Sequence, residues 1–91
     1  MVLLDLLGRR WALRVLWELR DGPLQFRELQ QHCGGISSSV LNQRLGELRD
    51  ACITERADRG YALSEEGERL LAELGPLHAW AERWAGRGAG S

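Results

Sequence analysis

Apolar residues recur every three or four positions in several stretches of the chain, which is the spacing of amphipathic helices. These stretches predict helices over residues 9–20, 25–33, 37–48 and 64–84, after a short apolar turn or helix over residues 1–8. Residues 53–56 and 61–64 favour β-structure, and residues 57–60 between them are typical of a hairpin loop. The chain is therefore predicted to be mostly α-helical with one small β-hairpin.

Several helix ends are marked by residues that satisfy unpaired backbone groups. Ser37 and Ser64 are predicted N-caps, because a serine hydroxyl can accept hydrogen bonds from the amides of the first turn. The Asp-Gly-Pro segment at residues 21–23 is expected to end the helix over residues 9–20. Pro76 has no amide hydrogen and is expected to kink or split the last helix.

The helix over residues 37–48 has one apolar side and one unusually polar side. Its apolar side repeats leucine at positions 41, 45 and 48. Its other side carries short hydroxyls and amides in place of the Glu and Lys of a typical solvated face, and such groups suit base edges and phosphates. The candidate DNA contacts on this helix are Ser37, Ser38, Ser39, Asn42, Gln43 and Arg44. Arg44 has a second possible role, which is to brace the fold through Glu28 or Glu47.

Two helices joined by a glycine-containing turn and followed by a hairpin form the pattern of a winged helix-turn-helix. The helix pair here covers residues 25–33 and 37–48, with Gly34 and Gly35 in the turn. The hairpin would be the wing, and Arg56 and Arg59 at its tip are candidate contacts to phosphates or a minor groove. The alternative is that neighbouring acidic residues neutralise both arginines.

Composition limits what the chain can be. Its 91 residues, 44% of them hydrophobic, suit one folded domain, predicted over residues 1–85. A glycine-rich tail over residues 86–91 is expected to be disordered. The net charge is −1, so a DNA-binding surface would be a local patch of the twelve basic residues, all of which are arginine. The sequence shows no signal peptide and no apolar run of membrane length, and a soluble, cytoplasmic domain is expected.

Ionisable residues outside the polar helix suggest no reactive site. The sequence lacks a nucleophile–base constellation, a phosphate loop and a paired-carboxylate motif, so no enzyme activity and no cofactor are predicted. His32 and His78 lack the neighbouring ligands of a metal site, and no metal is predicted. Cys33 and Cys52 are interpreted as a buried hydrophobe and an incidental substitution, with a thiol redox switch as the alternative.

The chain resembles the HxlR-type winged helix-turn-helix transcriptional regulators, a bacterial family related to MarR. The resemblance rests on Leu-Gly-Arg-Arg-Trp at residues 7–11, Asp-Gly-Pro-Leu-Gln-Phe-Arg-Glu-Leu at residues 21–29, the recognition segment over residues 35–48, and Tyr-Ala-Leu-Ser-Glu-Glu-Gly at residues 61–67. The chain departs from the family pattern in its short wing, in having no cysteine before residue 7, and at Cys52, which replaces a glycine where positive φ is favoured.

The resemblance implies a homodimeric repressor or activator that binds double-stranded DNA and assembles through its N- and C-terminal helices. The residues expected at the dimer interface are Leu3, Leu7, Trp11, Leu77, Trp80 and Trp84. The two last tryptophans also share a helix face by their spacing, although packing within one subunit is the alternative. We expect a pseudo-palindromic operator with half-sites roughly 34–36 Å apart. The alternatives are a protein-interaction module that does not bind DNA, and a regulator gated by a small molecule or by thiol oxidation.

Overall fold

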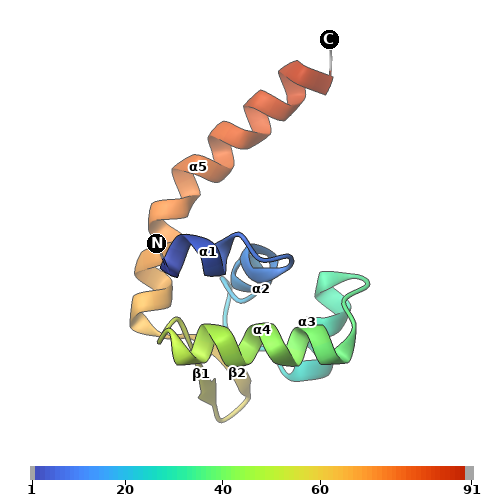
Figure 1. The fold of residues 1–91 in the computed structure, drawn as a ribbon, viewed down its shortest axis with the longest axis vertical. Helices are drawn as coiled ribbons and strands as arrows, with labels where there is room; N and C mark the ends of the chain where they lie inside the picture. The colour runs from blue at the N-terminus through green and yellow to red at the C-terminus, as the bar shows by residue number, and fades with distance from the viewer. Residues whose placement is uncertain (1, 90–91) are drawn as a thin grey trace.

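The computed structural model describes residues 2–89, which form five helices and one two-stranded hairpin (Figure 1). In chain order the elements are α1 (Val2–Leu7), α2 (Ala12–Glu18), α3 (Phe26–Cys33), α4 (Ser38–Asp50), β1 (Thr54–Ala57), β2 (Gly60–Leu63) and α5 (Glu65–Ala89). The predicted fold class, a mostly helical winged helix-turn-helix with a small hairpin, is confirmed. Within the described residues no helix has both the length and the apolarity that crossing a membrane requires.

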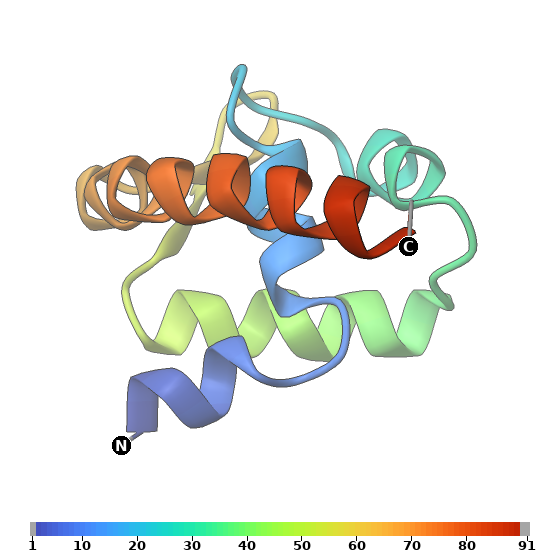
Figure 2. The ribbon, with the colours of Figure 1, turned by 90° about the horizontal axis from the view of Figure 1, so that it is seen from above.

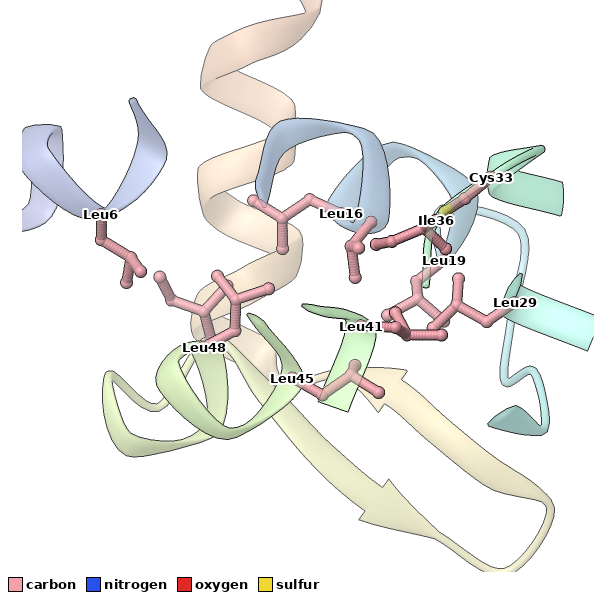
Figure 3. Packing of buried hydrophobic residues seen from close by; sticks show 11 residues of the cluster. Leu6, Leu16, Leu19, Leu29, Cys33, Ile36, Leu41, Leu45 and Leu48 are labelled. Atoms are coloured by element: carbon pink, nitrogen blue, oxygen red, sulfur yellow. The ribbon is translucent and has the colours of Figure 1, made fainter. Parts of the chain in front are cut away.

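The helix α2 lies at the centre of the domain and packs against each of the other helices (Figure 2). Leucines from α1, α3 and α4 point toward it and toward one another (Figure 3). The core residues are Leu6, Val15, Leu16, Leu19, Leu29, Cys33, Ile36, Leu41, Leu45, Leu48 and Ile53. Because each fully buried leucine contributes about 1.5–3 kcal/mol, this cluster fixes α4 firmly on the domain.

The start of α2 differs from the sequence prediction. The helix begins at Ala12, three positions after the predicted residue 9, because the preceding residues form a turn in which Trp11 adopts a left-handed φ of 78°. Arg44 of α4 donates a hydrogen bond from Nε to the carbonyl of Arg10 over 2.9 Å. This long-range contact holds the turn against α4 and sets where α2 can begin.

The hairpin is tighter than predicted and is anchored to the helical part of the domain. β1 and β2 pair antiparallel, and the last pair joins Ala57 to Gly60. The turn therefore contains two residues, 58 and 59, rather than the four of the predicted loop. Leu24, in the loop before α3, extends the ladder through two backbone hydrogen bonds with Tyr61. The Leu24 amide donates to the Tyr61 carbonyl over 3.0 Å, and the Tyr61 amide donates to the Leu24 carbonyl over 2.8 Å.

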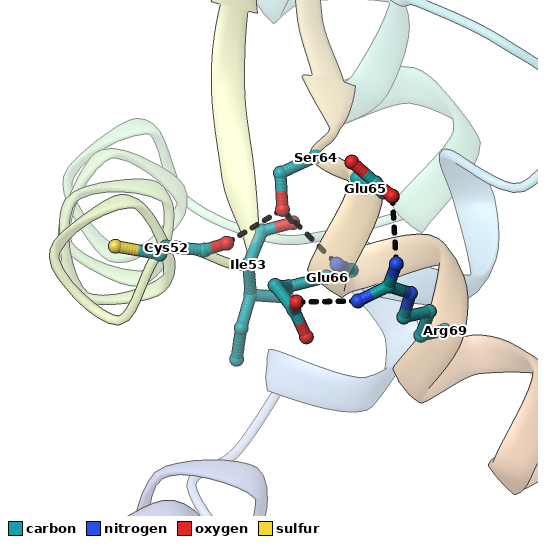
Figure 4. A network of polar contacts seen from close by, with 7 residues as sticks. Cys52, Ile53, Ser64, Glu65, Glu66 and Arg69 are labelled. Carbon is teal, nitrogen blue, oxygen red and sulfur yellow. Dashed lines mark hydrogen bonds and ion pairs between the residues drawn. The ribbon is translucent and has the colours of Figure 1, made fainter.

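The helix α5 begins at a polar network around Ser64 (Figure 4). The hydroxyl of Ser64 accepts a hydrogen bond from the Gly67 amide over 3.0 Å, which confirms the predicted N-cap. The same hydroxyl lies 3.0 Å from the carbonyl oxygen of Ile53 and 2.5 Å from that of Cys52. The network joins the start of α5 to the segment that leaves α4.

The helix α5 is longer and less interrupted than predicted. It passes through Pro76 as one helix of 25 residues, so the predicted split does not occur. Pro76 is exposed, and water can satisfy the carbonyl that loses its partner. Residues 86–89 also belong to α5, so the expected disordered tail over 86–91 is wrong for these four, and residues 90 and 91 lie outside the described residues. A helix already formed continues at little cost unless a stop signal ends it.

Candidate DNA-binding surface

The helix α4 turns its leucines inward and its short polar side chains outward. The three leucines at positions 41, 45 and 48 are at most 3% exposed. The exposed residues on the opposite side are Ser38, Ser39, Asn42 and Gln43, which we call the recognition face. Within residues 2–89 no hydrogen bond joins the amide of Asn42 to another side chain. The recognition face therefore offers hydroxyls and amides to an external partner.

The first turn of α4 is fixed by its cap and by α3. Ser37 has an extended backbone, and its hydroxyl accepts a hydrogen bond from the Val40 amide over 3.2 Å, as predicted for the N-cap. Gln30 of α3 donates to the Ser38 hydroxyl over 3.0 Å and to the Ile36 carbonyl over 3.3 Å. The recognition face thus begins on a rigid turn, and the hydroxyl of Ser37 already serves the helix.

Arg44 braces the fold, which is one of the two roles predicted for it. Its Nη1 donates to Glu47 over 2.7 Å, and its side chain is only 14% exposed. Glu47 also pairs with Arg9 from the turn before α2. Burial acts to raise the pKa of Glu47, but the hydrogen bond and charge of Arg44, with those of Arg9, outweigh it and lower this pKa below its ordinary value. We therefore assign Arg44 to bracing rather than to DNA.

The wing presents two arginines beside α4. Arg59 is exposed in the two-residue turn, whereas Arg56 lies on β1, with its guanidinium 4.8 Å from the ring of Tyr61. In the described part of the chain neither arginine forms an ion pair, so the alternative reading, neutralisation by neighbouring acids, is not seen. Asn42 and Arg49 line a pocket between α4 and the hairpin, with Arg56 on its strand side. The recognition face and the wing therefore adjoin.

The predicted dimer residues divide into two groups. Those exposed in the single chain are Leu3, Leu77, Trp80 and Trp84, with exposed fractions of 39%, 57%, 52% and 64%. The rings of the two tryptophans stack with centroids 6.3 Å apart on α5. Leu7 and Trp11 instead pack half-buried against the core of their own chain. These two therefore have less surface to offer a partner than the sequence suggested.

The two cysteines occupy different environments. Cys33 is 3% exposed, and burial followed by the charge of Glu18 raises the pKa of its thiol, with Arg14 opposing. Its interpretation as a buried hydrophobe is confirmed. Cys52 is exposed and has a φ of 64°, the left-handed conformation that the resemblance implied at this position. Within residues 2–89 no group of three His, Cys, Asp or Glu side chains is arranged to hold a metal ion.

Two residues near the recognition face were not among the candidate DNA contacts predicted from the sequence, although Arg49 was assigned to the polar side of its helix. Arg49 follows Asn42 by seven residues, so helical spacing alone places both on neighbouring parts of one face. Arg9 reaches α4 only through its contact with Glu47, 38 residues away in the chain. No local spacing signals that contact.

Known proteins share this fold and sequence pattern. Residues 6–89 match the family described as HxlR-like helix-turn-helix. The transcriptional regulator YodB of Bacillus subtilis is 34% identical over 87 residues, which cover 88% of this chain and 78% of YodB. The crystal structure of quinone-bound YodB has a TM-score of 0.80 at 38% identity, covering 87% of this chain and 90% of that one.

A second solved structure extends the likeness beyond YodB. A possible HxlR family transcriptional factor from Thermoplasma volcanium GSS1 has a TM-score of 0.82 at 29% identity, covering 89% of this chain and 79% of that one. YodB is an HTH-type transcriptional regulator and the Thermoplasma protein is a possible transcriptional factor, so both relatives point to transcriptional regulation. With the match over residues 6–89, the chain belongs to the HxlR-like helix-turn-helix family of transcriptional regulators.

Proposed function

We propose that this regulator acts in the cytoplasm as a homodimer that binds a specific, pseudo-palindromic DNA sequence. The observation that carries the proposal is the recognition face of α4, which is exposed, polar and mounted on a buried leucine stripe beside the wing. In this arrangement α4 enters a major groove, and a two-fold dimer places two such helices roughly 34–36 Å apart.

Each group on this surface suits a distinct contact. The amides of Asn42 and Gln43 suit adenine, which offers an acceptor and a donor side by side in the major groove. The hydroxyls of Ser38 and Ser39 on the first turn suit phosphate or sugar oxygens. Arg56 and Arg59 suit phosphates beside the helix and supply the salt-dependent part of the affinity.

The dimer would be built mainly by α5. The upper part of α5 extends away from the domain (Figure 1) and carries three large exposed apolar side chains, Leu77, Trp80 and Trp84. In a two-fold dimer these side chains would contact their copies on the partner's helix and bury apolar surface that is exposed to water in the monomer. Sedimentation velocity should show a dimer that Trp84→Glu dissociates, and a monomeric wild-type protein at micromolar concentration would refute the assembly.

Binding to DNA can be tested by fluorescence anisotropy with a labelled duplex from the gene's own upstream region. Asn42→Ala and Gln43→Ala should each weaken binding to that duplex about 30- to 25,000-fold, since the homodimer loses two base contacts of about 1–3 kcal/mol each, and should leave binding to random DNA unchanged. Gln31→Ala, which removes an exposed amide from α3, is the matched control. Equal binding of wild type and variants would refute base readout by this face. No binding of either duplex at low salt would favour a protein-interaction module.

A second candidate function, gating by a small molecule, is supported by one pocket. It lies between α2 and α5, has a volume of about 240 Å³, and is lined by Leu13, Trp17, Leu71, Leu74, Leu77, His78 and Ala81. The imidazole of His78 stacks on the indole of Trp17 at 4.4 Å, which gives this apolar pocket one polar edge. YodB has been crystallised with a quinone bound. An unreactive aromatic such as 2-naphthol should weaken DNA binding, and Leu74→Trp, which fills the pocket, should abolish that effect.

A further inference from the structure

Arg9 lies at the edge of the recognition face. It comes from the turn before α2, and its Nη1 donates to one carboxylate oxygen of Glu47. The same oxygen lies 3.5 Å from the amide nitrogen of Gln43, a member of the recognition face. Only one carboxylate therefore separates the guanidinium of Arg9 from a side chain proposed to contact bases.

Arg9 and the wing border opposite edges of α4. Asn42, Gly46 and Arg49 line the pocket on the hairpin side of the helix. Gln43 and Glu47 follow one another at i, i+4 and therefore form a separate row along the helix, which is the row that Arg9 contacts. An α-helix in a major groove has a phosphate strand on each side. The structure thus places arginines at both of these sides.

At this edge of α4 positive charge exceeds negative charge, and Arg9 supplies the excess. Arg44, which is 14% exposed, already balances the single negative charge of Glu47 at 2.7 Å. Arg9 adds a second positive charge, and its side chain is 51% exposed. It uses only Nη1 for Glu47, so Nε and Nη2 can still donate to another oxygen acceptor.

We propose that Arg9 binds a DNA phosphate on the side of α4 opposite the wing, with Glu47 as the residue that positions it. This inference rests on the proposed DNA binding and adds a second line of backbone contact to it. Glu47 holds the guanidinium beside the recognition face before DNA arrives, which reduces the side-chain ordering that binding would otherwise require. The unused nitrogens of the planar guanidinium then match the oxygens of a phosphate.

The test is the salt dependence of binding to a fluorescein-labelled duplex of mixed sequence, because a phosphate contact acts on any sequence. In a dimer, Arg9→Ala removes two contacts, so the slope of log K against log salt should become shallower by about 1.8, and binding near about 0.1 M salt should weaken about sixtyfold. Arg9→Lys keeps the charge and should keep most of the slope. The matched control is Arg69→Ala, because Arg69 is also an exposed arginine paired with glutamates, but on α5.

The outcomes separate this inference from the proposed function. If the wild type does not bind the duplex, DNA binding itself fails. If the wild type binds and Arg9→Ala has the same slope as Arg69→Ala, Arg9 only joins the turn to α4 and the inference is overturned. Circular dichroism melting of both variants identifies unfolding, and should Arg9→Ala not fold, a reduced slope in Arg9→Gln supports the contact while a wild-type slope overturns it.

Discussion

Replacing Gly67 by alanine would test the packing of α5 against the segment that leaves α4. Gly67 is buried in the first turn of α5. A Cβ atom on this residue would lie 2.1 Å from the carbonyl oxygen of Ile53 and 3.1 Å from its carbonyl carbon. The obstructing atoms belong to the backbone, which cannot rotate away as a flexible side chain can. The substitution therefore has to move α5 away from residue 53.

Three effects set the size of the change. Overpacking of this kind costs about 1–3 kcal/mol. The Ile53 carbonyl also accepts a hydrogen bond from the Ser64 amide over 3.0 Å, and losing it costs about 1 kcal/mol. Alanine offsets about 1 kcal/mol through its higher helix propensity. The net expectation is a free energy of unfolding lower by about 1–3 kcal/mol.

Urea denaturation at a fixed protein concentration measures this difference, since any assembly would make stability depend on concentration. The control is Gly46→Ala, another helical glycine, whose added Cβ would meet no atom within 4 Å. The control should gain up to about 1 kcal/mol from helix propensity alone. The reasoning is refuted if Gly67→Ala matches or exceeds the wild type while Gly46→Ala gains.

Three further predictions concern ionisable and strained residues. Cys52→Gly should raise the free energy of unfolding by about 0.5–1 kcal/mol, because glycine adopts the φ of 64° without strain; a less stable variant would contradict this. The pKa of Glu47 is lowered by folding, so its stabilising effect is complete above the ordinary glutamate pKa and is lost as the pH falls through the lowered value. Glu47→Gln should therefore flatten the acid side of a stability–pH curve, and an unchanged acid side would argue against it. A thiol reagent should modify Cys52 of the native protein quickly and Cys33 only after unfolding. In the Cys52→Ser variant Cys33 is the remaining thiol, so fast modification of this variant in its native state would be inconsistent with the burial of Cys33.

The elements that sequence predicts well are those set by neighbours in the chain. The cap at Ser37 depends on an amide three residues away, and the leucine stripe of α4 repeats at helical spacing. Ser64 likewise caps α5 by accepting a hydrogen bond from the amide three residues further along. Local rules of this kind are sufficient to predict the exposed polar side of α4 and the hairpin from the sequence.

The features that sequence did not predict depend on contacts between distant residues. The start of α2 is set by Arg44, which binds the carbonyl of Arg10 from 34 residues away. The ion pair between Arg9 and Glu47 likewise joins residues that lie 38 positions apart in the chain. Trp11, which the resemblance placed at the dimer interface, packs mostly against the domain's own core. Periodicity reports that a side chain avoids water and does not identify the surface that covers it.

The two-residue turn of the wing has a consequence for how much sequence the regulator can distinguish. Strands of four residues span roughly 13 Å, so in the proposed binding mode base readout by one subunit rests mainly on Asn42 and Gln43. Two base pairs recur about once in 16 positions, whereas two copies reading four would meet a match about once in 256, and the frequency of competing sites decides specificity. With so short a wing, most of the information in an operator would come from pairing two subunits rather than from either one.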